Sequence, residues 1–407
     1  MTIPKAFIYI GGSYPQIRAF EAIKNLGITT ILTDRSPNPP LKSLADHFFQ
    51  IDATDVEAFI RLGDDISEKF DLIGVYPIED YAVLSATALA EKFKIPYFDK
   101  FTAHIFLNKY ESHNVWTSNG ISTPDSILIK SGLNFVDLNT DILTKLTLPI
   151  IIKPVTSWGS QGVNVLYEND QYEFSRLITM SRRFSDDLIV QEYINGTIHN
   201  VDGVFLKNIY YPCNSYDRLP NPRFQNVTST ILEPSELEND IIDEMHFVLK
   251  KACNLIGLEN GPVTGDFVFL DEDLYLLEIS PHFHSVHQTS MRMNGTHYPM
   301  KSWIAYLSGC LNPQNILKES HLPGTSGLSS AWSDATGGIS KILIDNRIYE
   351  NTLIEDVHIR NQKGDKLATN DGILNCIALI WGFSEDRNAL LTSMDEASQL
   401  IKVETVE

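Results

Sequence analysis

The chain has 407 residues, of which 43% are hydrophobic and 21% are charged, as expected of a soluble globular protein with two or three domains. Its formal net charge of -20 argues against nucleic acid and membrane partners, because anionic polymers and anionic lipid surfaces require a basic protein surface. Small molecules are therefore the expected partners, and four scattered cysteines with no apolar leader favour a reduced, cytoplasmic location.

The first hundred residues alternate strand-like and helix-like segments, a pattern typical of a parallel sheet covered by helices. The expected strands are residues 6–10, 29–32 and 72–76, and the expected helices are residues 15–26 and 81–93. A Gly11-Gly12 turn follows the first strand, at the sheet edge where such folds bind ligands. Asp34 lies where a dinucleotide site has its ribose-binding acid, but the third glycine of that motif is missing, so a dehydrogenase is the less favoured alternative.

The middle of the chain predicts an α+β module that includes a lid. In order, we expect a helix over 101–119, strands near 148–152, 163–167, 188–193 and from about 200, a polar loop over 211–230, and a helix over 234–257. A hairpin follows, with arms at 265–270 and 274–279 joined by a turn at 271–273. Beyond residue 327 the pattern changes to short strands and turns, which indicates a small β-rich unit at the C-terminal end.

A glycine-bearing loop directly follows the buried strand that ends at Lys153 and Pro154. Gly159 and Gly162 allow the backbone to fold over a ligand, and exposed amides beside an ammonium group suit an oxyanion such as a nucleotide phosphate. The alternative is an exposed lysine before an ordinary turn.

The hairpin carries one carboxylate on each arm, Asp266 and Glu278, at alternating positions among apolar residues. Two carboxylates on neighbouring strands can point to one face of a sheet, and hard oxygen ligands of this kind suit Mg²⁺. A pair of surface or salt-bridged acids is the alternative.

Taken in order, these motifs resemble the ATP-grasp superfamily of ligases. The matching segments are the Gly11-Gly12 turn with Thr33-Asp34, Asn108-Lys109, Lys153-Pro154, the loop 157–162, the segment 190–196, Gly265-Asp266, and 277–282. The resemblance implies a mixed α/β and α+β fold with a pre-ATP-grasp βαβ domain over 1–98, an ATP-grasp domain over 99–310 and a β-rich domain over 311–407. It further implies a mobile lid over about 125–195, and a homodimer is plausible.

The resemblance also implies an activity: phosphorylation of a small carboxylate by ATP with Mg²⁺, and attack of an amine on the resulting acyl phosphate. The implied nucleotide-binding residues are Lys109, Lys153, Ser157, Gly159, Ser160, Gln161, Gly162, Glu192, Tyr193 and Ile194. The implied metal ligands are Asp266, Glu278 and Ser280, and the implied catalytic residues are Lys153, His282 and Arg292. Two alternatives remain open, a nucleotide-binding protein that has lost catalysis and a bicarbonate-dependent carboxylase of the same superfamily.

Three positions depart from the superfamily pattern. Ile198 replaces a ribose-binding acid, Ser280 replaces a metal-binding asparagine, and His282 replaces an arginine near the transferred phosphate. Imidazole cannot form the bidentate contact of guanidinium and is only partly charged at neutral pH.

Several further residues are candidates for substrate binding. They are Glu79, Arg218, Arg223, His284 and His287. The spacing of His282, His284 and His287 would also permit a transition-metal site, although hydrogen bonding within an active site explains these residues without one.

Overall fold

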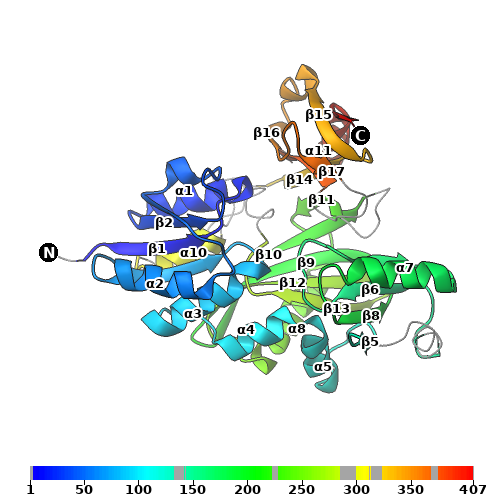
Figure 1. The fold of residues 1–407 in the computed structure, drawn as a ribbon, viewed down its shortest axis with the longest axis horizontal. Helices are drawn as coiled ribbons and strands as arrows, with labels where there is room; N and C mark the ends of the chain where they lie inside the picture. The colour runs from blue at the N-terminus through cyan, green and yellow to red at the C-terminus, as the bar shows by residue number, and fades with distance from the viewer. Residues whose placement is uncertain are drawn as a thin grey trace.

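The computed structural model describes residues 3–132, 142, 144–221, 228–284, 299–310, 312, 323–367 and 375–406. It is a mixed α/β protein in which a parallel sheet and a lid lie at opposite ends of a long antiparallel sheet (Figure 1). None of the helices in these residues has both the length and the apolar composition that crossing a lipid bilayer requires.

The N-terminal part is a parallel sheet in the order β3-β2-β1-β4, as the βαβ pattern predicts. Its strands are β1 (Lys5–Ile10), β2 (Thr29–Asp34), β3 (His47–Gln50) and β4 (Asp71–Pro77). The helices of this part are α1 (Ile17–Asn25), α2 (Val56–Ser67) and α3 (Val83–Phe93). Asp34 Oδ2 accepts a hydrogen bond from the Gly12 amide at 2.8 Å, so this carboxylate holds the first turn of the sheet.

The lid is an antiparallel sheet in the order β5-β8-β6-β7, and helix α7 (Gln171–Ser181) packs against it. Its strands are β5 (Ser126–Ile129), β6 (Ile150–Pro154), β7 (Asn164–Leu166) and β8 (Leu188–Glu192). Phe174 of α7 is fully buried against the sheet in a small core of its own. The lid therefore has the packing of a separate folding unit.

The long antiparallel sheet has eight strands in the order β13-β12-β9-β10-β11-β14-β18-β16. These strands are β9 (Thr197–Leu206), β10 (Ile209–Pro220), β11 (Thr228–Glu233), β12 (Gly261–Leu270), β13 (Asp273–Ser280), β14 (Thr325–Trp332), β16 (Ile354–Ile359) and β18 (Cys376–Ser384). Alternate residues of β9 serve two cores: Val201 and Phe205 pack with helix α8 (Asn239–Leu255), and Val204 and Leu206 pack with the N-terminal part. Strand β11 precedes residue 310 in the sequence and β14 follows it, and the two strands pair within this one sheet. The domain boundary that the sequence predicts at residue 310 therefore falls between neighbouring strands of the same sheet.

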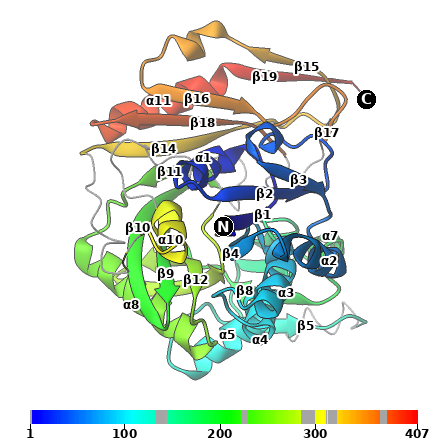
Figure 2. The same cartoon turned by 90° about the vertical axis from the view of Figure 1, so that its left-hand side faces the viewer.

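Helices α4 (Lys100–Leu107) and α5 (Lys109–Ser118) lie at the bottom of the view in Figure 2, and α10 (Pro299–Leu307) lies beside α1. Residues 101–119 thus form two helices, where the sequence predicts one. Asn108 causes the break, because its extended backbone ends α4 while its side chain caps α5 by accepting from the Glu111 amide.

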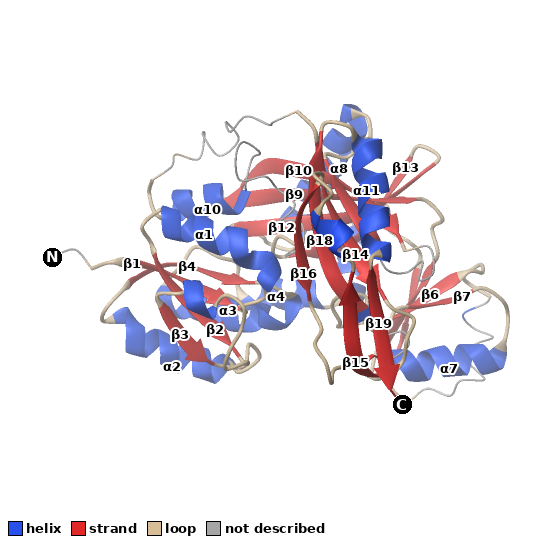
Figure 3. Cartoon of the chain, turned by 90° about the horizontal axis from the view of Figure 1, so that it is seen from above, coloured by secondary structure: helices blue, strands red, loops and turns tan. Residues whose placement is uncertain are grey.

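The C-terminal part adds a small sheet, β17-β15-β19, and a helix that the sequence does not predict. Its remaining elements are β15 (Gly337–Ile344), β17 (Lys366–Leu367), α11 (Arg387–Gln399) and β19 (Ile401–Val406). Helix α11 lies alongside β14 and β18 (Figure 3). Its first residue, Arg387, donates to the Pro234 carbonyl at 2.8 Å and to the buried carboxylate of Asp217 on β10, and so ties this part to the middle of the molecule.

The prediction of a polar loop over residues 211–230 is wrong, because most of this segment is strand. Residues up to Pro220 belong to β10 and pair with β9, and strand β11 begins at Thr228. Strand β10 contains two prolines, and proline in a sequence argues against a paired strand. An irregularity in register between Pro212 and Ser215 accommodates one of them.

Candidate active site

Lys109 is a buried lysine at the first turn of α5, against the end of strand β6. Its main-chain amide donates to the Val155 carbonyl at 3.1 Å, and its Nζ donates to the Ser157 carbonyl at 2.7 Å. The same Nζ lies 2.6 Å from Glu278 Oε1. Burial alone would lower the pKa of Lys109, but Glu278 and Asp80 raise it above the usual value. Lys109 is therefore a fixed positive charge that joins α5 and β13 to residues 157–162, which we call the phosphate loop.

Lys153 differs from Lys109 because no described residue accepts a hydrogen bond from its Nζ. The side chain lies on β6 and is 8% exposed. Burial lowers its pKa to about 8, and the neighbouring charge of Lys109 also opposes protonation while Glu278 and Asp266 favour it. A buried ammonium group without an acceptor is costly, so this position is suited to an anionic ligand.

Gln161, in the phosphate loop, presents a second unsatisfied donor. Its Nε2 is buried and has no hydrogen-bond partner among the described residues. Gly162 follows with φ +71°, and a Cβ atom there would lie 2.7 Å from Phe184 Cδ2. The loop thus needs glycine at this position, and Gln161 leaves a buried donor free for a ligand.

The two carboxylates of the hairpin lie directly opposite each other, as the sequence predicts. Asp266 on β12 pairs with Glu278 on β13, and side chains at paired positions of an antiparallel sheet share a face. Arg218 Nη1 donates to Asp266 Oδ2 at 2.8 Å, and Asn200 Nδ2 donates to Asp266 Oδ1. Burial nevertheless raises the pKa of Asp266 above its usual value.

The donor set around these carboxylates fits a hard divalent cation. Asn200 of β9 is fully buried, and its Oδ1 has no hydrogen-bond partner among the residues that the structure describes. Together with Asp266 and Glu278, this oxygen would complete a set of the kind that Mg²⁺ prefers. Sequence reasoning missed Asn200, because its position opposite Asp266 depends on the long-range pairing of β9 with β12.

His282 is buried and bonded at both ring nitrogens. Its Nε2 lies 3.0 Å from Asp80 Oδ1 and its Nδ1 lies 3.1 Å from the Phe283 carbonyl. Both partners are acceptors, so this environment suits the protonated ring, which can donate from both nitrogens. Burial would lower the pKa of His282, but Asp80 raises it above the usual value. The hydrogen bonds of His282 are thus directed at Asp80 and at the main chain.

His284 is a neutral histidine beside Ser280. Its Nε2 lies 3.2 Å from Ser280 Oγ and 3.9 Å from Asp266 Oδ1. Burial, followed by the charges of Arg218 and His282, lowers its pKa to about 3. Within the described residues, no three His, Cys, Asp or Glu side chains gather in a way that would hold a metal ion.

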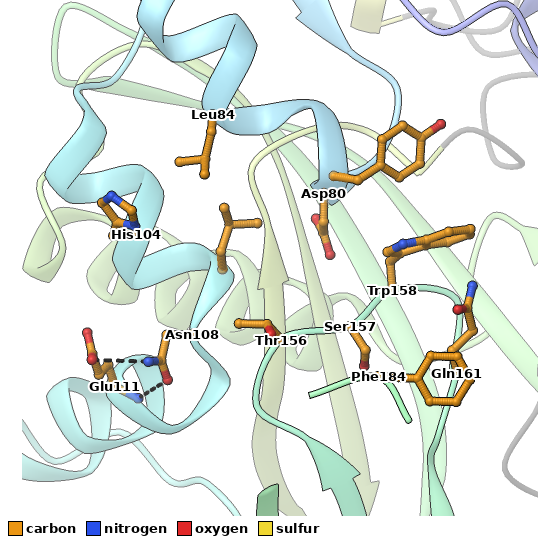
Figure 4. A pocket seen from close by; sticks show the side chains of 12 residues that line it. Asp80, Leu84, His104, Asn108, Glu111, Thr156, Ser157, Trp158, Gln161 and Phe184 are labelled. Atoms are coloured by element: carbon orange, nitrogen blue, oxygen red, sulfur yellow. Dashed lines mark hydrogen bonds between the residues drawn. The ribbon is translucent and has the colours of Figure 1, made fainter. Parts of the chain in front are cut away.

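A cavity of about 550 Å³ opens beside the phosphate loop (Figure 4). Its lining residues are Asp80, Tyr81, Leu84, His104, Leu107, Asn108, Glu111, Thr156, Ser157, Trp158, Gln161 and Phe184. The lining includes two carboxylates and three aromatic rings, and no lysine or arginine is among these residues. Trp158 contacts Tyr81 edge to face, with ring centroids 5.3 Å apart. We call this space the Trp158 cavity.

The predicted adenine-binding segment lies away from this cavity. The Glu192 amide donates to the Asp125 carbonyl at 3.0 Å, and the Tyr193 amide donates to the Pro149 carbonyl at 3.3 Å. These two amides are thus occupied, which leaves Ile194 as the candidate donor of the segment. Glu79 does not line the Trp158 cavity, whereas the adjacent Asp80 does.

The remaining predicted site residues fall into two groups. Arg218, predicted as a substrate ligand, lies on β10 and contacts Asp266. Arg223, His287 and Arg292 lie outside the described residues.

Comparison with known proteins is consistent with this geometry. Residues 106–286 match a family described as the ATP-grasp domain. The D-alanine–D-alanine ligase of Rickettsia typhi is 27% identical over 248 residues, which cover 55% of this chain and 71% of that protein. Two solved structures share the fold over nearly all of both chains: an L-amino acid ligase from Bacillus licheniformis (TM-score 0.77, 15% identity, 100% of both chains covered) and an N5-carboxyaminoimidazole synthetase from Staphylococcus aureus complexed with ADP (TM-score 0.73, 17% identity, 98% of both chains).

Proposed function

Since the chain belongs to the ATP-grasp superfamily, we propose that it is an ATP- and Mg²⁺-dependent ligase that joins a small carboxylate to an amine. One observation carries the proposal: the buried Lys153 Nζ, which lacks an acceptor among the described residues, lies near enough to the cross-strand pair Asp266 and Glu278 for both carboxylates to favour its charged form. Unused donors suit phosphate oxygens, and paired carboxylates suit the metal that accompanies a nucleotide.

In the first step, a carboxylate oxygen of the substrate attacks the terminal phosphorus of ATP, ADP leaves, and an acyl phosphate forms. Lys109 and Lys153 would hold the phosphate oxygens and stabilise the charge that develops during transfer. Asp266, Glu278 and Asn200 would hold Mg²⁺, which supplies further neutralisation of that charge when bound.

In the second step, the amine nitrogen attacks the acyl carbon, phosphate leaves, and the nitrogen loses a proton to give the amide. The Trp158 cavity borders the phosphate loop at Ser157 and Gln161, so it offers the substrates a route to the reacting phosphate. Its aromatic walls, Trp158 and Tyr81, would help to exclude water from the acyl phosphate.

The test uses hydroxylamine, which converts any acyl phosphate into a stable hydroxamate. Purified protein with ATP and Mg²⁺ is offered a panel of amino acids, and hydroxamate and phosphate are measured. Lys153→Met should abolish both products, because methionine fills the space without the charge. Lys341→Met, which removes an exposed lysine from β15, is the matched control and should match the unaltered protein.

Two outcomes would overturn the proposal. ATP binding by calorimetry without hydroxamate from any acid would identify a nucleotide-binding protein without ligase activity. Phosphate release that depends on bicarbonate and not on an amino acid would identify a carboxylase.

A further inference from the structure

The Trp158 cavity is joined to the proposed phosphate and metal site at two points. The Ser157 carbonyl accepts a hydrogen bond from Lys109 Nζ at 2.7 Å, and Ser157 lines the cavity. Asp80 also lines the cavity, and its Oδ1 lies 3.0 Å from His282 Nε2. A ligand that contacts these two residues therefore lies one side chain away from Lys109 and His282.

Two carboxylates line the cavity, and each has one oxygen that accepts no hydrogen bond from a described residue. Asp80 uses Oδ1 for His282, and Glu111 uses Oε1 for Asn108 Nδ2 at 3.0 Å. Asp80 Oδ2 and Glu111 Oε2 are thus available to a cation such as an ammonium group. The same two charges repel carboxylates and phosphates, so a nucleotide is poorly matched to this cavity.

Gln161 supplies the cavity with a hydrogen-bond donor. The residue is 8% exposed, and its Nε2 is buried without a hydrogen-bond partner in the described part of the chain. A buried donor in this state destabilises the fold, and an oxygen of a ligand would satisfy it. Figure 4 shows Gln161, Asp80 and Trp158 on one side of the cavity and Glu111 on the other. Because Asp80 repels negative charge, the matching oxygen is a neutral one, such as an amide carbonyl.

Five further residues give the cavity apolar surface. Tyr81, Trp158 and Phe184 contribute aromatic rings, and Leu84 and Leu107 contribute aliphatic side chains. The ring of a ligand gains edge-to-face or offset contacts with such rings in addition to the burial of its area, which favours an aromatic body. The volume of about 550 Å³ lies within the range of about 300–1,000 Å³ that is typical of small-molecule pockets.

We propose that the Trp158 cavity binds the amine substrate, and that this substrate is an aromatic α-amino amide. The inference rests on the proposed ligase function and specifies its amine. The ammonium group contacts Asp80, and the amide carbonyl accepts from Gln161. The aromatic side chain packs against Trp158 and the neighbouring rings. An α-amino amide carries its ammonium and its carbonyl on adjacent carbon atoms, which suits two partners on the same side of the cavity. A free amino acid has a carboxylate in place of the amide, and Asp80 repels it.

The first test is calorimetry on the complete protein with three ligands of the same ring and chain length. L-phenylalaninamide has the ammonium and the neutral carbonyl, L-phenylalanine has a carboxylate in place of the amide, and 3-phenylpropanamide lacks the ammonium. We expect L-phenylalaninamide to bind at least tenfold more tightly than either of the other two. Equal or weaker binding of L-phenylalaninamide would overturn the proposal.

A competition experiment separates the cavity from the nucleotide site. Saturating ADP with Mg²⁺ should leave the affinity for L-phenylalaninamide within twofold of its value in the absence of nucleotide. Displacement of L-phenylalaninamide by ADP would show that the two ligands share one site and would overturn the assignment of the cavity to the amine.

The variant Trp158→Leu places the ligand in this cavity. Leucine keeps an apolar side chain but removes the ring, so the affinity for L-phenylalaninamide should fall at least tenfold. Tyr172→Leu is the matched control, because it removes an aromatic ring that is 80% exposed on α7, and its affinity should not change. An unchanged affinity in Trp158→Leu would show that the ligand binds elsewhere.

Two more variants assign the individual contacts. Asp80→Asn should remove the preference for L-phenylalaninamide over 3-phenylpropanamide, because only the ammonium requires the charge. An Asp80 that acts only through His282 would instead keep this preference. Gln161→Leu should remove any preference for L-phenylalaninamide over 2-phenylethylamine, which lacks the amide group. The control Asp273→Asn, which removes an exposed carboxylate from β13, should keep both preferences. Both preferences intact in Asp80→Asn and Gln161→Leu would overturn the two contacts.

Turnover distinguishes a failure of this inference from a failure of the proposed function. Binding of L-phenylalaninamide as described, without hydroxamate formation from any acid, would overturn the ligase and keep the amine site. If the protein forms hydroxamate from an acid, that acid and L-phenylalaninamide should give an amide, with a KM for the amine at least tenfold higher in Trp158→Leu. Hydroxamate formation without use or binding of L-phenylalaninamide would keep the ligase and overturn the amine site.

Discussion

Lys153→Met should make the ligand-free protein more stable at neutral pH while it abolishes nucleotide binding. Burial and the charge of Lys109 hold the Lys153 pKa at about 8, against 10.5 for an unperturbed lysine. A base whose pKa is depressed in the folded state destabilises that state wherever it is protonated. The folded protein regains the lost free energy of unfolding as the pH rises from about 8 toward 10.5, because Lys153 then loses its proton in the folded state.

The magnitude follows from the size of the shift. The difference of 10.5 − 8 is 2.5 pKa units. At about 1.36 kcal/mol per unit, the buried ammonium costs about 3 kcal/mol at pH 7. At pH 9.5, one unit below the unperturbed value, the remaining cost is about 1 kcal/mol. Methionine has a similar length and no charge, so the variant should gain about these amounts.

Urea unfolding at pH 7 and pH 9.5, followed by tryptophan fluorescence without nucleotide, measures the difference. The variant Lys341→Met controls for the loss of any lysine and should show no gain at either pH. Addition of ATP and Mg²⁺ should stabilise the unaltered protein and leave Lys153→Met unchanged. If Lys153→Met were less stable than the unaltered protein at pH 7, Lys153 would be a structural ion-pair partner, and the assignment of an anion site would fail.

Three further predictions concern the lid and the C-terminal part. Gly162→Ala should reduce hydroxamate formation at least tenfold with little effect on the unfolding temperature, because the added methyl group would meet Phe184 and shift the phosphate loop. Phe174→Ala should cost about 3–5 kcal/mol in the lid alone, and limited proteolysis should then cut the lid before the rest of the chain. Arg387→Gln should lower the free energy of unfolding, measured with urea, by about 2 kcal/mol, because Asp217 loses the guanidinium group but keeps its other hydrogen-bond donors. An unchanged urea transition would mean that apolar packing alone holds α11.

The sequence predicted the parts of the site that depend on local order. The phosphate loop was recognisable because Lys153, Gly159 and Gly162 are close in the chain, and glycine allows the positive φ values that the backbone adopts there. The hairpin was recognisable from its short turn, which pairs Leu270 with Asp273. That register alone would put Asp266 opposite Leu277, and an irregularity between Asp266 and Phe267 shifts the pairing to Glu278.

Residues brought in by long-range pairing could not be predicted in this way. Asn200 and Arg218 reach Asp266 through the pairing of β9 with β12 and with β10, which no local pattern specifies. The wrong loop prediction over 211–230 hid the strand that carries Arg218, because prolines and polar residues in a fully paired strand resemble a turn. The missing helix α11 is a similar case, since its polar residues outweigh the few buried ones, such as Leu390 and Met394.

The unbroken pairing of β11 with β14 has a practical consequence for anyone who shortens this protein. Residues 230–233 hydrogen-bond to residues 326–329. A fragment that stops near residue 310 would lack β14, so the main-chain amides and carbonyls on that edge of β11 would have no hydrogen-bond partners. An exposed edge of this kind pairs with strands of other molecules. Such a fragment should accumulate as insoluble aggregates even though the predicted nucleotide site is complete in its sequence, and biochemical work on the catalytic part should retain the C-terminal strands.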